Sequence, residues 1–216
     1  MSTNTIYDTK VGAFLDALAS GEPAPGGGAA AALSGAMAAA LVAMVCGLTV
    51  GREKFREVEG HLQAVLDRAT MARANFLLLA ERDQAAFNAV MGAYALPRAT
   101  DDTDEDRAAR QAAIQSALQE ATRVPLSTLQ QALELLPQAL DAVEHGNPNA
   151  RSDGAGAYFL AQAALDGALL NVKINLSSIK DEGFKAGILD QVGDALASRR
   201  QQEARMAKLL QRFFPD

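Results

Sequence analysis

Several residue types that mark particular classes of protein are scarce in this chain of 216 residues. Tryptophan is absent and aromatic residues make up only 5% of the sequence. This disfavours a β-sheet protein, because strands favour aromatic and β-branched residues. Cys46 is the single cysteine, so no disulfide can form within the chain. His61 and His145 stand alone and neither HExxH nor CxxC occurs, so a metal site has no support.

Positive charge is also scattered rather than clustered. The formal net charge is −6, and the sequence has neither a basic tract nor an RNA-binding aromatic motif. We therefore expect no nucleic-acid partner. The first ten residues lack the basic cluster of a signal peptide, and we expect a cytoplasmic protein. With 49% hydrophobic residues, the composition fits one domain over residues 1–216, and we expect residues 1–7 to be a loose terminus.

Alanine is abundant, above all in an uncharged run from Ala29 to Val50. Its length raises the possibility of a membrane span. However, the run is mostly Ala rather than Leu, Ile or Phe, it has no counterpart elsewhere, and no aromatic belt flanks it. We therefore reject a span and predict a central helix that is buried on several sides. Cys46 lies in this run and is expected to be a buried structural thiol rather than a nucleophile.

A glycine loop, Pro23-Ala-Pro-Gly-Gly-Gly28, precedes this helix. Gly26, Gly27 and Gly28 have no Cβ atom, so the backbone can approach a ligand closely. The free N–H groups at the start of the following helix suit an anion or a polar group. The spacing matches neither GxGxxG nor GxxxxGK[ST], and a flexible turn before a buried helix fits the loop equally well.

The rest of the chain has helical periodicity and no convincing strand pattern. We predict an all-α bundle of about six helices, two of them long. Thr103 is expected to cap the fourth helix, and Ser152 or Asp153 to cap the fifth. Pro125 and Pro137 are expected to kink the fourth helix. The predicted helices span about 8–19, 29–45, 52–95, 104–144, 153–179 and 184–214.

One charged residue, Asp83, lies on the apolar heptad seam of the third predicted helix. Burial would raise the pKa of this carboxyl group, which suits a general acid or base. Alternatively, the helix is rotated slightly, Phe87 fills the core position and Asp83 is solvated. In the fifth helix, Asn171, Asn175 and Ser178 share one face. They either join two helices by hydrogen bonds or recognise a ligand rich in donors and acceptors.

Taken together, six segments resemble the cyclodeaminase/cyclohydrolase family. This family includes the C-terminal domain of formiminotransferase-cyclodeaminase and stand-alone bacterial methenyltetrahydrofolate cyclohydrolases. The resemblance extends from about Val11 to Phe213. One departure is Ala29, where the family often has Ser, and it removes one possible hydroxyl contact. The segments are Pro23-Ala-Pro-Gly-Gly-Gly28, Leu48-Thr49, Asp83-Gln-Ala-Ala-Phe87, Val124-Pro125, Asn147-Pro-Asn-Ala-Arg-Ser-Asp153 and Asn171-Val-Lys-Ile-Asn175.

The resemblance implies an all-helical homodimer that acts on a tetrahydrofolate derivative without a metal or redox cofactor. It makes Asp83 the catalytic carboxylate. The substrate-binding residues that it implies are Gly26, Gly27, Gly28, Asn147, Ser152, Asp153, Asn171 and Asn175. The anionic glutamate tail of the folate could meet Arg52, Lys54, Arg151 or Lys173.

We therefore predict a methenyltetrahydrofolate cyclohydrolase. A formimidoyltetrahydrofolate cyclodeaminase is the close alternative, because both reactions use the same kind of proton transfer. A non-catalytic folate-binding or structural helical protein is a further alternative. No formiminotransferase domain is present in this sequence, so transferase activity is not expected.

Overall fold

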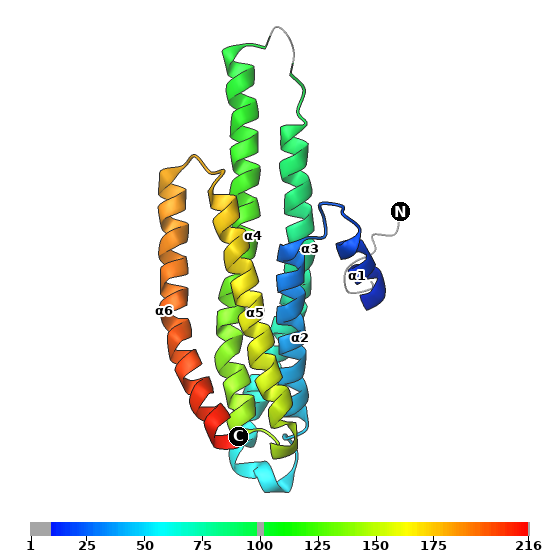
Figure 1. The fold of residues 1–216 in the computed structure, drawn as a ribbon, viewed down its shortest axis with the longest axis vertical. Coiled ribbons are helices and arrows are strands. Elements are labelled where there is room, and N and C mark those ends of the chain that lie inside the picture. Colours follow the sequence, from blue (N-terminus) through cyan, green and yellow to red (C-terminus); the bar gives the residue numbers. More distant parts are fainter. Residues whose placement is uncertain (1–9, 99–101, 216) are drawn as a thin grey trace.

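The computed structural model describes residues 10–98 and 102–215, and within these residues it contains helices and no strands. The prediction of an all-α protein with six helices is confirmed. Figure 1 shows a long bundle in which α3 and α4 extend beyond the start of α2, and α6 lies along the outside. The elements are α1 (Val11–Ala19), α2 (Gly27–Gly47), η1 (Glu53–Val58), α3 (Glu59–Tyr94), α4 (Asp104–His145), η2 (Pro148–Ala150), α5 (Arg151–Leu176) and α6 (Glu182–Phe213), where η denotes a 3₁₀ helix.

The central element is α2, as predicted, and it contacts α3, α4 and α5. Its small residues let the neighbouring helices come very close. A Cβ atom on Gly35 would lie only 2.4 Å from the Phe76 ring, and one on Gly167 of α5 would lie 3.0 Å from the Cβ of Ala31. Within the described residues, α2 is the one helix long and apolar enough to cross a membrane. Its contacts with three other helices are those of a core helix in a bundle.

The predicted third helix begins later than expected, at Glu59 rather than near residue 52. The preceding residues form the separate 3₁₀ helix η1, and Phe55 interrupts it with φ −118° and ψ 15°. Gly51 has a φ of +77°, and its backbone N–H donates to the Glu59 carboxylate. From Glu59 onward the heptad seam is confirmed. Its buried members are Leu62, Val65, Ala69, Phe76, Leu79 and Ala86.

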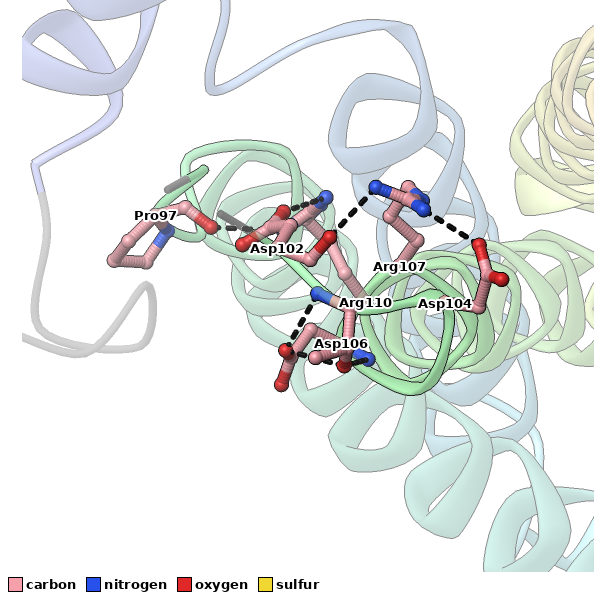
Figure 2. A network of polar contacts seen from close by, with 7 residues as sticks. Pro97, Asp102, Asp104, Asp106, Arg107 and Arg110 are labelled. Atoms are coloured by element: carbon pink, nitrogen blue, oxygen red, sulfur yellow. Dashed lines mark hydrogen bonds and ion pairs between the residues drawn. The ribbon is translucent and has the colours of Figure 1, made fainter. Parts of the chain in front are cut away.

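The long helix α4 begins with the predicted Thr103 cap. The Thr103 hydroxyl accepts a hydrogen bond from the Asp106 N–H, and the Asp106 carboxylate accepts one from the Thr103 N–H. Figure 2 shows this capping box beside Arg110, which donates to the Pro97 carbonyl and to the Asp102 carboxylate. These bonds hold the end of α3 to the start of α4. Pro125 lies inside α4, and the helix continues through it without interruption.

The predicted cap of α5 is wrong. The N-cap is Ala150, and Ser152 and Asp153 lie inside the first turn. The chain reaches α5 through η2, which Asn147 caps by accepting a hydrogen bond from the Asn149 N–H. The extra 3₁₀ turn moves the start of α5 towards the N-terminus relative to the predicted start.

Candidate functional site

The start of α2 lies between α3 on one side and α5 on the other. Its N-cap is Gly26, which has no side chain to accept hydrogen bonds from the first-turn N–H groups. These N–H groups therefore depend on other parts of the molecule or on a ligand. They also carry the positive end of the helix dipole, which favours a negative charge.

The Asp83 carboxylate of α3 supplies that charge. It lies directly over the Cα of Gly28, where a Cβ atom would be 2.1 Å from Oδ1 and 2.6 Å from Oδ2. Only glycine permits this approach. The flanking seam residues Leu79 and Ala86 are buried, so α3 is not rotated to expose Asp83. Asp83 therefore lies on the seam as predicted, and its side chain is half-buried rather than solvated.

Two opposing effects act on the pKa of Asp83. Burial raises this pKa above its usual value of 3.8, and the backbone N–H of Ala29 lowers it by a hydrogen bond to the carboxylate. Burial is the larger effect, so the pKa is raised. The contribution of Ala29 was missed by sequence reasoning, because a backbone donor leaves no signal in the side-chain pattern. A carboxylate of this kind can accept and return a proton more readily than an exposed aspartate.

On the opposite side of the helix start, Asn171 of α5 lies against Gly27. A Cβ atom on Gly27 would be 3.5 Å from Asn171 Nδ2, which is an ordinary contact. This amide also donates to the Gly167 carbonyl of its own helix over 2.8 Å. The structure therefore brings Gly26, Gly27, Gly28, Asp83 and Asn171 together around one end of α2.

Asn175 lies one turn further along α5 and joins α5 to α4. Its Nδ2 donates to the Ala121 carbonyl over 2.7 Å. From the sequence, this side chain was expected either to join two helices by a hydrogen bond or to recognise a ligand. The structure shows the hydrogen bond between helices. Ser178 follows the end of α5 and lies in a turn.

The other predicted substrate-binding residues lie at the opposite end of α2. The Asn147 backbone N–H donates to Thr49 Oγ1 over 2.9 Å, and its side-chain amide donates to the Leu48 carbonyl over 3.4 Å. Ser152 and Asp153 follow in the first turn of α5. Because α2 has 21 residues, the two ends are about 30 Å apart. A single chain does not bring Asn147, Ser152 and Asp153 to the glycine loop.

Three of the four basic residues considered for the glutamate tail share that opposite end. Arg52 caps η1, Lys54 lies within it, and Arg151 begins α5. The Arg151 side chain is also occupied, because it donates to the Val143 carbonyl and stacks on the Phe213 ring. In residues 10–98 and 102–215, no three His, Cys, Asp or Glu side chains form a group that could hold a metal ion.

Fold and site define a helical bundle with a half-buried carboxylate over the glycine start of its central helix. A family model described as "Formiminotransferase-cyclodeaminase" matches residues 10–194. The chain belongs to this family of folate cyclohydrolase and cyclodeaminase enzymes, which confirms the family resemblance seen in the sequence.

Three relatives illustrate the family. The chain is 46% identical over 184 residues to a methenyltetrahydrofolate cyclohydrolase of Methylorubrum extorquens, covering 85% of this chain and 87% of that protein. It is 34% identical over 191 residues to the formimidoyltransferase-cyclodeaminase of Sus scrofa, covering 88% of this chain and 35% of that protein. The chain therefore spans about a third of this longer relative. The crystal structure of formiminotetrahydrofolate cyclodeaminase from Thermotoga maritima matches with a TM-score of 0.85 and 30% identity, covering 95% of this chain and 98% of that one.

Proposed function

We propose that this protein is a methenyltetrahydrofolate cyclohydrolase, which converts 5,10-methenyltetrahydrofolate and water to 10-formyltetrahydrofolate. The observation that carries this proposal is the half-buried Asp83 carboxylate held over Gly28. The cyclohydrolase of Methylorubrum extorquens supports it, because the match is 46% identical and extends over most of both chains. The cyclodeaminase relatives are less similar in sequence.

Asp83 can serve both proton transfers of this reaction. The substrate carries a positive charge shared by N5, the methenyl carbon and N10, and the Asp83 anion stabilises it. Water adds to the methenyl carbon while Asp83 accepts one of its protons. The carbon–N5 bond then breaks, N5 takes the proton from Asp83, and the remaining hydroxyl proton leaves as the formyl carbonyl forms on N10. One proton is released overall. The raised pKa of Asp83 makes its acid form available for the second step.

The variant Asp83→Asn tests this role. We expect kcat to fall by about 10²- to 10⁴-fold, because the amide cannot exchange the proton. Hydrolysis is followed as loss of the near-ultraviolet absorbance of the methenyl substrate, after subtraction of the buffer rate. Substrate binding, measured by calorimetry, should persist. The matched control is Asp67→Asn, which changes an exposed carboxylate of the same helix. Equal losses in both variants, or none in Asp83→Asn, would contradict the proposal.

A cyclodeaminase remains the second candidate, because the Thermotoga maritima protein of this description matches over nearly all of both chains. In that reaction N10 attacks the formimino carbon on N5, and ammonia leaves with a proton supplied by the enzyme. A parallel assay with 5-formiminotetrahydrofolate, scored for ammonia and for a gain of methenyl absorbance, separates the two activities. A folded protein that is silent in both assays would be a folate-binding or structural member of the family.

We also propose that the enzyme is a homodimer that pairs through the outer face of α2 and α5. These two helices lie side by side (Figure 1). Their outer face is apolar, and Met44, Phe159, Leu170 and Ile174 are exposed on it. A second copy would remove these side chains from water. Sedimentation equilibrium should give twice the chain mass.

Phe159→Glu tests this pairing surface, because it should shift the equilibrium towards the monomer. The matched control is Leu189→Glu, which changes an equally exposed apolar residue on α6. We expect Leu189→Glu to leave the equilibrium unchanged. A monomeric wild-type protein would refute the homodimer.

A further inference from the structure

A pocket of about 620 Å³ lies between α1, α2 and α3. Its walls are almost entirely apolar, and its volume is in the range of pockets that hold small molecules. Residues that line it include Phe14, Leu15, Leu18, Leu33, Met37 and Leu77. Neither the glycine loop nor Asp83 lines this pocket, so it is distinct from the site described above.

The helix α1 forms one wall of the pocket instead of packing fully into the core. It has no buried residue, and Val11 and Leu15 are 77% and 54% exposed. Phe14 is the α1 residue that packs against the core. The apolar side of α1 therefore encloses a space that an apolar ligand group can fill.

One end of the pocket is close to the proposed reaction site. Ala30 lines the pocket and follows Gly28 by two residues in α2. The contacts of Asp83 with Gly28 and of Phe76 with Gly35 show that α3 runs antiparallel to α2. The pocket consequently extends from the Asp83 end of α2 towards its middle.

Arg73 is the one charged residue among those that line the pocket. In the part of the chain that the structure describes, it takes part in none of the ion pairs. It lies ten residues before Asp83 on α3, which corresponds to about 15 Å along the helix axis. A guanidinium group binds a carboxylate through two parallel hydrogen bonds.

We propose that this pocket binds the p-aminobenzoyl-glutamate half of the folate, with Arg73 as the partner of a glutamate carboxylate. The inference rests on the proposed function, because that function supplies the folate. In the substrate, the benzoyl ring joins N10 to the glutamate, whose carboxylates lie roughly 9–12 Å from N10 by ordinary bond lengths. The apolar ring suits the apolar walls of the pocket. The distance from N10 to the glutamate carboxylates fits the distance between Asp83 and Arg73 once these two side chains extend towards the ligand.

Lys173 is the competing partner for the carboxylate. It borders a depression beside Asn171, but that depression is formed by residues of α5 alone, including Leu170 and Ile174. Leu170 and Ile174 also belong to the proposed pairing face, so a partner copy would cover this depression, whereas the pocket between α1, α2 and α3 has walls from three helices of one chain. The geometry therefore favours Arg73.

The kinetic test uses two substrates that differ only in the glutamate: 5,10-methenyltetrahydrofolate and 5,10-methenyltetrahydropteroate. Arg73→Gln should raise KM for the folate by about tenfold and leave kcat unchanged. A tenfold change corresponds to the loss of one charge-assisted contact of about 1.4 kcal/mol. It should leave KM for the pteroate nearly unchanged. The matched control is Arg68→Gln, which changes another exposed arginine of α3 that does not line the pocket.

The binding test uses p-aminobenzoyl-L-glutamate as the probe and calorimetry as the readout, so it does not depend on turnover. The probe should bind to the wild-type protein and to Arg68→Gln, and bind at least about tenfold more weakly to Arg73→Gln. If the probe does not bind to the wild-type protein, the inference is wrong. A pocket that is filled by a second copy of this chain would give this result. An increase in KM in Lys173→Gln that is absent in Arg73→Gln would also overturn the inference. Probe binding without turnover of the wild type would overturn the proposed function and leave this pocket assignment standing.

Discussion

Replacing Gly28 by alanine tests whether the position of the Asp83 carboxylate matters for the chemistry. A Cβ atom at residue 28 would lie 2.1 Å from Asp83 Oδ1, 2.5 Å from Cγ and 2.6 Å from Oδ2. No real Cβ contact is this short, so the carboxylate must move. Since it is the end of a side chain, it can move by rotating, and the two helices can stay in place.

The size of the movement determines the expected effect. Ordinary contact begins at 3.4 Å, so Oδ1 must retreat from 2.1 Å by more than 1 Å. A displacement of about 1 Å at a reacting group costs about 10²-fold in rate. The cost in stability should be small. An Asp83 rotamer strained by rotation costs about 0.5–1.5 kcal/mol, whereas alanine is favoured over glycine in a helix by up to about 1 kcal/mol. We therefore expect kcat to fall about 100-fold while the free energy of unfolding changes by less than about 1 kcal/mol.

The assay pairs initial hydrolysis rates with urea unfolding on the same preparations. Gly47→Ala is the matched control, because this residue ends the same helix and a Cβ atom there would meet nothing within 4 Å. It should retain full activity and be unchanged or slightly more stable. A Gly28→Ala enzyme with kcat within threefold of the wild type would refute the reasoning, because a displaced carboxylate would then be harmless.

Three further predictions concern stability and reactivity. Burial raises the native pKa of Asp83 above 3.8, so the native state binds this proton more tightly than the unfolded state, and its contribution to stability falls as pH rises from about 3.8 through the native pKa. Asp83→Asn has no carboxyl group to ionise, so thermal melts should show this variant to be more stable than the wild type at pH 7. The difference in stability should shrink towards pH 3, and a difference that does not change with pH would contradict the raised pKa. Thr49→Val should lower the free energy of unfolding in urea by about 1–3 kcal/mol, because the buried Thr49 hydroxyl accepts the Asn147 N–H and donates to the Val45 carbonyl; an unchanged midpoint would show that these bonds add nothing. Burial raises the pKa of Cys46 to about 11, so a thiol reagent at pH 8 should react at the rate of unfolding, and rapid reaction of the folded protein would show that this thiol is accessible.

Much of the fold follows from local pattern. The seam of α3, the Thr103 cap and the small-residue helix α2 are each encoded by residues close together in the chain, and each was predicted. The break at Phe55 was missed because no proline or glycine marks it. The start of α5 was misplaced because Ser152 and Asp153 are good caps in isolation, whereas the preceding Asn147-Pro148 pair starts a 3₁₀ turn that leads directly into the helix.

The candidate site was predictable only in part. The seam position identified Asp83, and the glycines identified a place of close approach, but nothing local indicated that the two meet at Gly28. That contact depends on the register between α2 and α3, which Phe76 against Gly35 helps to set. The position of the motif that begins at Asn147 could not be predicted either. Its polar residues do not indicate whether they lie near the start of α2, at the glycine loop, or near its end.

The loose attachment of α1 has a consequence for motion. A helix without a buried residue or a side-chain N-cap can open while the rest of the bundle stays folded. Its amide hydrogens should therefore exchange with solvent much faster than those of α2, whose opening requires the whole core to unfold. A ligand between the two helices would bind only the closed form and would slow exchange in α1 alone. The first helix would then act as a separately folding unit, and its closing would couple ligand capture to local order.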